Sequence, residues 1–135
     1  MTYLLDTNIC IAAMNDATSR ARARLADEQR AHRSVLVSSV SVFELFYGAH
    51  KSAKLVVNLK KARAFLEPLQ HASVDFEDAE VAGLVRADLE KKGRPIGAYD
   101  YLIAGQALRR GLVLVTDNEG EFRRVNGLRI ENWVR

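Results

Sequence analysis

Three acidic residues stand out because each is the only charged residue in a long stretch of sequence. Residues 1–15 contain only Asp6, residues 35–49 only Glu44, and residues 95–108 only Asp100. Since 27% of the chain is charged, an even distribution would place about four charges in each window. The flanking residues are mostly apolar, so we expect these acids to be buried. A buried carboxylate is unfavourable unless a cation or a set of hydrogen-bond donors meets it.

One shared divalent cation would satisfy all three acids. Carboxylate oxygens select Mg²⁺ or Mn²⁺ over zinc, because no cluster of cysteine and histidine accompanies them. The three histidines, His32, His50 and His71, are dispersed along the chain. Carboxylates around one or two Mg²⁺ ions activate water and stabilise the leaving oxygen in phosphodiester hydrolysis. The chemistry that these residues suggest is therefore metal-dependent phosphodiester cleavage.

The acids differ in how easily a structural role explains them. Asp6 and Asp100 each stand near the start of an expected helix, where an aspartate is a good cap or favours the helix dipole. Glu44 lies in the middle of an apolar helical segment and cannot be a cap. Asp117 is a candidate fourth acid or a turn residue, and Glu119 and Glu121 compete with it.

Small polar residues accompany the acids and are expected to orient ligands or water molecules. Thr7 and Asn8 directly follow Asp6, and Thr116 directly precedes Asp117.

Strands and helices alternate along the sequence. Buried strands are expected at 2–6 and 112–116, with shorter strands at 35–37, 73–75 and 128–130. Helices are expected at 9–14, 16–32, 38–47, 52–66, 76–92, 99–110 and 119–125. Gly48 and Gly111 would end two of these helices. This order predicts an α/β fold with a mostly parallel sheet.

In such a sheet the ligand site lies beyond the carboxyl ends of the strands. Asp6 and Asp117 each follow a strongly predicted strand. Topology alone therefore predicts that these two acids meet at one edge of the sheet.

The helix at 76–92 has an apolar stripe that predicts its buried face. The stripe consists of Val81, Leu84, Val85 and Leu89.

Length and composition limit the class of protein. The chain has 135 residues, is 48% hydrophobic and carries a net charge of +3, which suits one globular domain over residues 1–135. No apolar run approaches the roughly 20 residues that span a bilayer. The first residues do not resemble a secretion signal. The single cysteine, Cys10, excludes an intrachain disulfide and suits a reducing compartment. We therefore expect a cytoplasmic protein.

Basic residues fall into three clusters that could hold phosphates around an acidic cleft or could simply be solvated helix surface. They are Arg20, Arg22, Arg24, Arg30 and Arg33; Lys51, Lys54, Lys60, Lys61 and Arg63; and Lys91, Lys92 and Arg94.

Four ordered segments resemble the motifs of the PIN domain, and more narrowly those of the VapC toxins of bacterial toxin–antitoxin pairs. They are LLDTN around Asp6, SVFELFYG around Glu44, IGAYDYLIA around Asp100 and LVTDN around Asp117. The closing GLRIENW, which starts at Gly127, also resembles the ending usual in that family. Four motifs in order cover the whole chain, which makes the resemblance specific.

The resemblance implies a three-layer α/β/α sandwich that cuts a chosen structured RNA with Mg²⁺, for which Mn²⁺ can substitute. It also implies a homodimer neutralised by a cognate VapB-type antitoxin. That antitoxin lays its C-terminal segment over the toxin, often blocks the acidic pocket with a basic side chain, and carries the complex to operator DNA. The exposed aromatic and aliphatic residues of 42–59 are the expected antitoxin groove.

The same resemblance implies roles for individual residues. Asp6, Glu44 and Asp100 match the three acids that hold metal. Asp117 is the preferred fourth acid, although many relatives have an uncharged residue there and keep the equivalents of Asn118 and Glu121.

Two alternatives remain open from the sequence. One is a catalytically idle RNA- or partner-binding module of the same fold, which would be expected to lose acids that this chain keeps. The other is a haloacid-dehalogenase-like phosphatase, which requires a second aspartate where Asn8 stands and leaves Glu44 unexplained.

Overall fold

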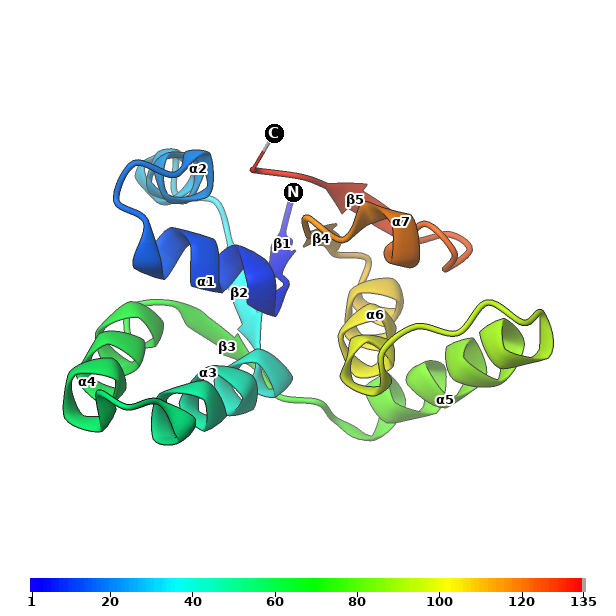
Figure 1. Cartoon of the computed structure of the whole chain (residues 1–135). Helices are drawn as coiled ribbons and strands as arrows, with labels where there is room; N and C mark the ends of the chain where they lie inside the picture. Colours follow the sequence, from blue (N-terminus) through cyan, green and yellow to red (C-terminus); the bar gives the residue numbers. More distant parts are fainter. Residues whose placement is uncertain (135) are drawn as a thin grey trace.

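The computed structural model describes residues 1–134 and contains one sheet of five parallel strands (Figure 1). The strands are β1 (Tyr3–Leu5), β2 (Val35–Ser38), β3 (Gln70–Ala72), β4 (Val113–Val115) and β5 (Arg129–Glu131). Their order in the sheet is β3-β2-β1-β4-β5, and each neighbouring pair is parallel. The α/β prediction is confirmed.

Helices cover both faces of this sheet and make a three-layer sandwich (Figure 1). Alternation along the strands divides the core: Tyr3 and Leu5 of β1 point into one apolar cluster and Leu4 into the other. The first face carries α1 (Thr7–Asn15), α2 (Arg20–Arg30), α3 (Ser39–Lys51) and α4 (Leu55–Leu66). The second face carries α5 (Phe76–Lys91), α6 (Ala98–Arg110) and α7 (Glu119–Phe122).

The strand order places a topological switch point beside β1. The chain moves from β1 outward to β2 and β3, and then returns to the other side of β1 to form β4 and β5. Open parallel sheets bind ligands at the carboxyl edge beside such a point. Asp6 leaves β1 and Thr116 leaves β4 at this edge, so the edge beside the switch point is where a site is expected.

Several helix boundaries differ from those predicted by the sequence. The helix predicted at 16–32 begins only at Arg20. Asp16 instead accepts hydrogen bonds from the backbone and hydroxyl of Thr18, and Ser19 caps the new helix by accepting from the backbone of Arg22. The side chains of Asp16 and Ser19 therefore form hydrogen bonds with nearby backbone N–H groups, and the helix begins only after them.

Gly48 does not end its helix, contrary to the sequence prediction. α3 continues to Lys51, and Ser52 closes it by donating from both its backbone and its hydroxyl to the carbonyl of Ala49. Gly111 does end α6, in a left-handed conformation with φ of 65°, as predicted.

The strand predicted at 73–75 lies three residues earlier, as β3. Asp75 is instead the N-cap of α5, where it forms a reciprocal capping box with Asp78. Because the backbone nitrogen of Asp75 donates to Asp78 in this capping box, it is not available for hydrogen bonds to a neighbouring strand.

The predicted apolar stripe of α5 is wrong at Leu84, which is 71% exposed. The buried face of the helix consists of Asp78, Ala82, Val85 and Leu89. The apolar pattern does not identify Asp78 as buried, because this residue is charged.

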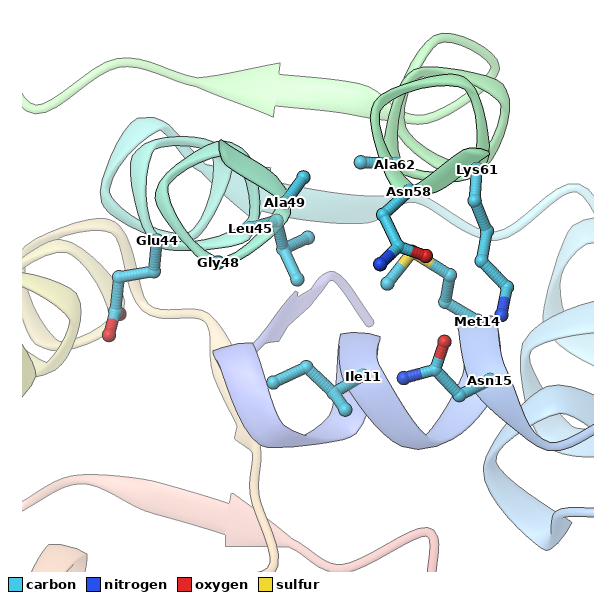
Figure 2. A pocket seen from close by; sticks show the side chains of 10 residues that line it. All are labelled: Ile11, Met14, Asn15, Glu44, Leu45, Gly48, Ala49, Asn58, Lys61 and Ala62. Carbon is cyan, nitrogen blue, oxygen red and sulfur yellow. The ribbon is translucent and has the colours of Figure 1, made fainter. Parts of the chain in front are cut away.

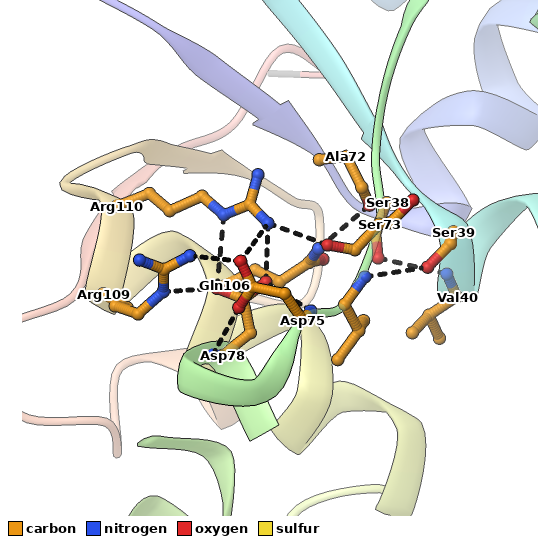
Figure 3. Close-up of polar contacts among 11 residues, drawn as sticks. Ser38, Ser39, Val40, Ala72, Ser73, Asp75, Asp78, Gln106, Arg109 and Arg110 are labelled. Atoms are coloured by element: carbon orange, nitrogen blue, oxygen red, sulfur yellow. Dashed lines mark hydrogen bonds and ion pairs between the residues drawn. The ribbon is translucent and has the colours of Figure 1, made fainter. Parts of the chain in front are cut away.

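Figure 3 shows how that ion is accommodated. Arg109 and Arg110, in the last turn of α6, both donate to Asp78, and Arg109 also donates to Asp75. Burial alone would raise the pKa of Asp78, but the hydrogen bonds from Arg110 and Arg109 lower that pKa well below its ordinary value. This network joins the start of α5 to the end of α6.

A second buried acid secures the C-terminal segment. Glu28 accepts hydrogen bonds from Arg24 and Arg33. The Arg24 guanidinium lies 5.0 Å from the ring centroid of Trp133, whose ring meets that of Tyr3 edge-on at 5.1 Å. The closing segment is therefore held against the first strand.

No helix within residues 1–134 has the length and apolar character needed to cross a membrane.

Gly105 and Gly83 provide a matched test of the packing between α5 and α6. A Cβ added to Gly105 would lie 2.8 Å from the backbone nitrogen of Ala82, whereas one added to Gly83 would meet nothing within 4 Å. We expect Gly105→Ala to destabilise the protein by about 1–3 kcal/mol through overpacking. Gly83→Ala should stabilise it by about 0.5–1 kcal/mol through helix propensity. Urea unfolding measures both, and equal effects of the two substitutions would contradict the close approach of the helices.

Candidate active site

Asp6 is the most buried acid of the candidate site, with 3% of its surface exposed. It is the N-cap of α1, and its Oδ1 accepts a hydrogen bond from the backbone nitrogen of Thr7 at 2.8 Å. Its Oδ2 accepts from the hydroxyl of Thr116 at 2.8 Å. Both oxygens are thus fixed by neutral donors, one from the helix after β1 and one from the end of β4.

Thr7 connects this aspartate to Glu44. The Thr7 hydroxyl donates to Oε1 of Glu44 at 2.8 Å and lies 2.8 Å from the hydroxyl of Ser41. Because a hydroxyl carries one hydrogen, Ser41 must be the donor in the second contact. A chain of hydrogen bonds therefore runs from Ser41 through Thr7 to Glu44, and it sets the position of the Glu44 carboxylate.

A parallel arrangement positions Glu121. The backbone nitrogen of Asn118 donates to the Thr116 hydroxyl at 2.9 Å, which in turn donates to Asp6. The Asn118 amide donates to Oε2 of Glu121 at 2.7 Å. The segment after β4 therefore orients two acids at once.

Asp100 reaches the site from the first turn of α6, whose N-cap is Gly97. A Cβ added to Gly97 would lie 2.8 Å from Oδ2 of Asp100. The absence of a side chain at Gly97 leaves the space that the Asp100 carboxylate occupies.

These four acids lie close enough for their charges to influence one another. Burial raises the pKa of Asp100 to about 7, with further contributions from the charges of Asp6, Glu121 and Glu44. Burial also raises the pKa of Asp6, against the hydrogen bonds from Thr116 and Thr7, and Glu44 and Glu121 add to the increase. The acids come from four separate segments, and the charges of Asp6, Glu121 and Glu44 all act on Asp100.

These acids have no basic partner in the part of the chain that the structure describes. Each ion pair within residues 1–134 involves other acids. In particular, no guanidinium within residues 1–134 forms an ion pair with Glu44. The carboxylates of the site are therefore not balanced by an ion pair in this part of the chain.

In this arrangement the acidic side chains of the candidate site do not form a complete set of metal ligands. No group of three or more His, Cys, Asp or Glu side chains within residues 1–134 could hold a metal ion in this arrangement. Like charges repel without a cation between them, and this repulsion favours separated or protonated carboxylates. The donors nevertheless fit Mg²⁺ or Mn²⁺, because each one is a carboxylate, hydroxyl or amide oxygen.

The fourth acid differs from the sequence preference. Glu121 contributes to the raised pKa of both Asp6 and Asp100. Asp117 is exposed, and its Oδ1 accepts a hydrogen bond from the amide of Asn132. The placement therefore favours Glu121 over Asp117. The sequence could not distinguish them, since both are acids just after the same strand.

Among the supporting residues, Thr7, Thr116 and Asn118 contact the acids as described above. Asn8 is exposed on α1, so its predicted supporting role stays a prediction. Ser41 and Gly97 were not identified from the sequence. The signal for Ser41 was its place three residues before Glu44, which puts both side chains on one face of a helix.

Most arginines of the first basic cluster form hydrogen bonds or ion pairs within the protein. Arg24 and Arg33 bind Glu28, Arg30 binds Asp27, and Arg22 donates to the carbonyls of Ala13 and Met14.

The three histidines are exposed, and Cys10 is fully buried. Burial and the charge of Asp6 raise the pKa of the Cys10 thiol.

An apolar pocket of about 200 Å³ lies between α1, α3 and α4, with Glu44 at its rim. Figure 2 shows the Glu44 carboxylate pointing away from Leu45 and Ile11, which line the pocket. Lys61 and Asn58 provide polar groups from α4. The pocket and the acids are therefore adjacent but separate features.

Comparison with known proteins agrees with this fold. Residues 3–128 match the model of the PIN domain. The chain is 40% identical over 133 residues to a protein of Shigella flexneri named tRNA(fMet)-specific endonuclease VapC, and the alignment covers 98% of each.

Two solved structures are similar to the chain over nearly its whole length. DNA-bound VapBC from Salmonella typhimurium has a TM-score of 0.91 at 40% identity, and 98% of each chain is covered. VapBC2 from Rickettsia felis, bound to a DNA fragment from its promoter, has a TM-score of 0.92 at 36% identity, with 98% of this chain and 99% of that chain covered. The chain therefore belongs to the PIN-domain family and, within it, to the VapC ribonucleases of VapBC toxin–antitoxin systems.

The raised pKa of Asp100 predicts how stability depends on pH in a chelator. The carboxyl binds a proton more tightly in the folded protein, with a pKa of about 7, than at its ordinary value of 3.8. The unfolded chain therefore holds fewer protons between about pH 4 and pH 7, and stability falls as the pH rises through this range.

In EDTA at pH 8, Asp100→Asn should be more stable than the wild type by about 1–2 kcal/mol, a value reduced for solvent screening of a half-buried group. At pH 3 the two proteins should have equal stability. Urea unfolding at both pH values measures the difference, and a difference independent of pH would contradict the prediction.

Proposed function

We propose that the protein is a divalent-metal-dependent endoribonuclease and the toxin of a type II toxin–antitoxin pair. The observation that carries this proposal is the meeting of Asp6, Glu44, Asp100 and Glu121 without a basic partner within residues 1–134. Such an arrangement is unfavourable for the fold alone, so it favours a function that uses the negative charge. Its position at the carboxyl edge of the sheet agrees with the site expected for this topology.

The proposed cofactor is Mg²⁺, for which Mn²⁺ can substitute, held by Asp6, Glu44 and Asp100. When bound, the ion would activate a water molecule and stabilise the leaving oxygen of the RNA phosphodiester. Asp6 is the best-oriented ligand, because its oxygens are fixed by Thr7 and Thr116. Asp100, with its pKa of about 7, must lose its proton before it binds a cation.

The chain's other residues hold these ligands in place. Thr7 donates to Glu44 and Asn118 donates to Glu121. Hydrogen bonds of this kind restrict ligand orientation and typically change metal affinity or activity by about 10- to 100-fold when removed. Glu121 is the proposed fourth acid and would act on the metal directly or through water.

The proposed substrate is a structured RNA, and a tRNA is the first candidate. This choice is supported by the relative from Shigella flexneri, which is named for cleavage of tRNA(fMet) and is 40% identical over 98% of both chains. The net charge of +3 favours a polyanionic partner. Lys61 of the second basic cluster, on α4, lines the pocket beside the site.

The proposed partner is a VapB-type antitoxin whose C-terminal segment lies in the pocket between α1, α3 and α4. Exposed aliphatic residues stand at the start of α4, the helix that also lines this pocket: Leu55, Val56 and Val57 are 42%, 64% and 62% exposed. Glu44 at the rim would let a basic side chain of the antitoxin reach the acids. A cytoplasmic homodimer that binds operator DNA through the antitoxin completes the proposal, supported by similarity to two DNA-bound VapBC structures.

Neither alternative from the sequence is favoured. The family match to the PIN domain removes the haloacid-dehalogenase-like phosphatase. An idle module would not need unpaired acids near one another, three of which are held by oriented donors.

Removal of the metal, or of its best-fixed ligand, should abolish RNA cleavage. We expect EDTA to stop cleavage of total tRNA, and Mg²⁺ or Mn²⁺ to restore it. Asp6→Asn should reduce cleavage by at least about 100-fold while the far-UV circular dichroism stays unchanged. Glu67→Gln, an exposed position on the far end of α4, is the matched control and should keep full activity. Cleavage by Asp6→Asn at the wild-type rate would remove Asp6 from the mechanism.

Two conservative substitutions distinguish the candidates for the fourth acid. Glu121→Gln removes a charge that acts on Asp6 and Asp100, so it should reduce cleavage by about 10- to 100-fold and weaken Mn²⁺ binding. Asp117→Asn should have a much smaller effect, because Asp117 is an exposed residue that contacts Asn132. Initial rates and Mn²⁺ titration by calorimetry measure both. A larger effect of Asp117→Asn than of Glu121→Gln would make Asp117 the fourth acid.

A further inference from the structure

Three exposed aromatic side chains form a continuous cluster on α3 and the start of α6. Phe43, Tyr47 and Tyr99 are 51%, 57% and 50% exposed. The rings of Phe43 and Tyr47 are stacked with centroids 6.4 Å apart, and Phe43 meets Tyr99 edge-on at 5.4 Å. These contacts fix the three rings relative to one another and leave much of their surface open to solvent.

The cluster lies beside the acids because it shares their helices. Phe43 directly precedes Glu44 on α3, and Tyr99 directly precedes Asp100 on α6. Successive residues of a helix point about 100° apart, so each ring stands next to its acid and not over it. The contact between Phe43 and Tyr99 therefore bridges the same two helices whose carboxylates meet in the site.

The chemistry of the cluster favours nucleic-acid bases over an aliphatic partner. Planar rings accept any base by stacking, which is how single-stranded RNA is held without sequence preference. The ammonium of Lys51 lies 5.7 Å from the ring centroid of Tyr47, so a cation stands at the outer end of the cluster. The separate exposed patch at Leu55, Val56 and Val57 contains aliphatic side chains only.

A negatively charged site also needs uncharged contacts to bind RNA. The four acids repel the phosphate that must approach them, so part of the binding free energy has to come from neighbouring groups that carry no negative charge. Aromatic stacking supplies such an interaction and is insensitive to the charge of the site.

We propose that Phe43, Tyr47 and Tyr99 form a stacking platform that holds an unpaired RNA base beside the phosphate to be cut. This proposal rests on the proposed ribonuclease function and adds a substrate-positioning surface to it. The platform positions the backbone of the bound nucleotide next to Glu44 and Asp100, while Lys51 faces the neighbouring phosphate.

The test compares two short unstructured RNA probes, one with normal bases and one of equal length with abasic nucleotides. Binding is measured in EDTA, where the proposed cleavage cannot occur. Phe43→Ala, Tyr47→Ala and Tyr99→Ala should each weaken binding of the base-bearing probe by about 5- to 100-fold and leave binding of the abasic probe unchanged. With Mg²⁺ and total tRNA, the same variants should raise KM more than they lower kcat.

Two further sets of variants distinguish a loss of stacking from a loss of folding. Tyr47→Trp and Tyr99→Phe retain a stacking ring and should retain binding. Phe76→Ala is the matched control, because Phe76 is 80% exposed but lies beside Asp75, which binds Arg109 at the opposite end of α6. That end is about 13 Å along the helix axis from Asp100, so this variant should bind both probes normally.

Several outcomes would overturn the platform. Equal weakening of the base-bearing and abasic probes would mean that stacking is not involved. Unchanged RNA binding with a loss of self-association or of binding to a VapB-type antitoxin would assign the cluster to a protein interface. If the wild type cleaves RNA and the alanine variants keep its KM, only the platform fails. If the wild type neither binds nor cleaves RNA, the proposed function fails as well.

Discussion

Repulsion among four carboxylates is the constraint on which the rest of this site depends. The charges of Asp6, Glu44 and Glu121 act on Asp100, and within residues 1–134 no arginine or lysine forms an ion pair with any of these acids. Elsewhere the protein solves the same problem differently: Glu28 and Asp78 are buried acids, and each is held by two arginines. Acids that stabilise the fold are neutralised by the chain itself. The acids of the site have no such basic partner within residues 1–134.

Neutral donors hold the site together in place of cations. The backbone of Thr7 and the hydroxyls of Thr7 and Thr116 fix the carboxylates of Asp6 and Glu44, and Asn118 fixes Glu121. Such donors orient a carboxylate without cancelling its charge. They stand at the carboxyl ends of β1 and β4, which flank the switch point of the sheet. The topology therefore brings both the acids and their supports to one edge.

The surface around the acids divides by chemistry. The pocket between α1, α3 and α4 is lined by apolar side chains such as Ile11 and Leu45 together with polar groups from α4, and no aromatic side chain of residues 1–134 lines it. Aromatic rings instead stand on α3 and α6 beside Glu44 and Asp100. A toxin must present its site to RNA and also allow a protein to cover it. Separate aliphatic and aromatic surfaces that share Glu44 as a boundary would let an antitoxin segment and an RNA base compete for the same acids.

The sequence by itself determined the α/β class, the motif order and the three isolated acids, because local charge patterning and apolar strands are readable along the chain. It misplaced the start of α2, the end of α3 and the position of β3, where capping by Ser19, Ser52 and Asp75 overrode propensity. Only the tertiary structure brings the charge of Glu121 within reach of Asp6 and Asp100, and only it shows that Ser41 contacts Thr7 and that Gly97 adjoins Asp100. These depend on contacts between residues far apart in the chain, and no local pattern encodes which side chain faces a distant partner.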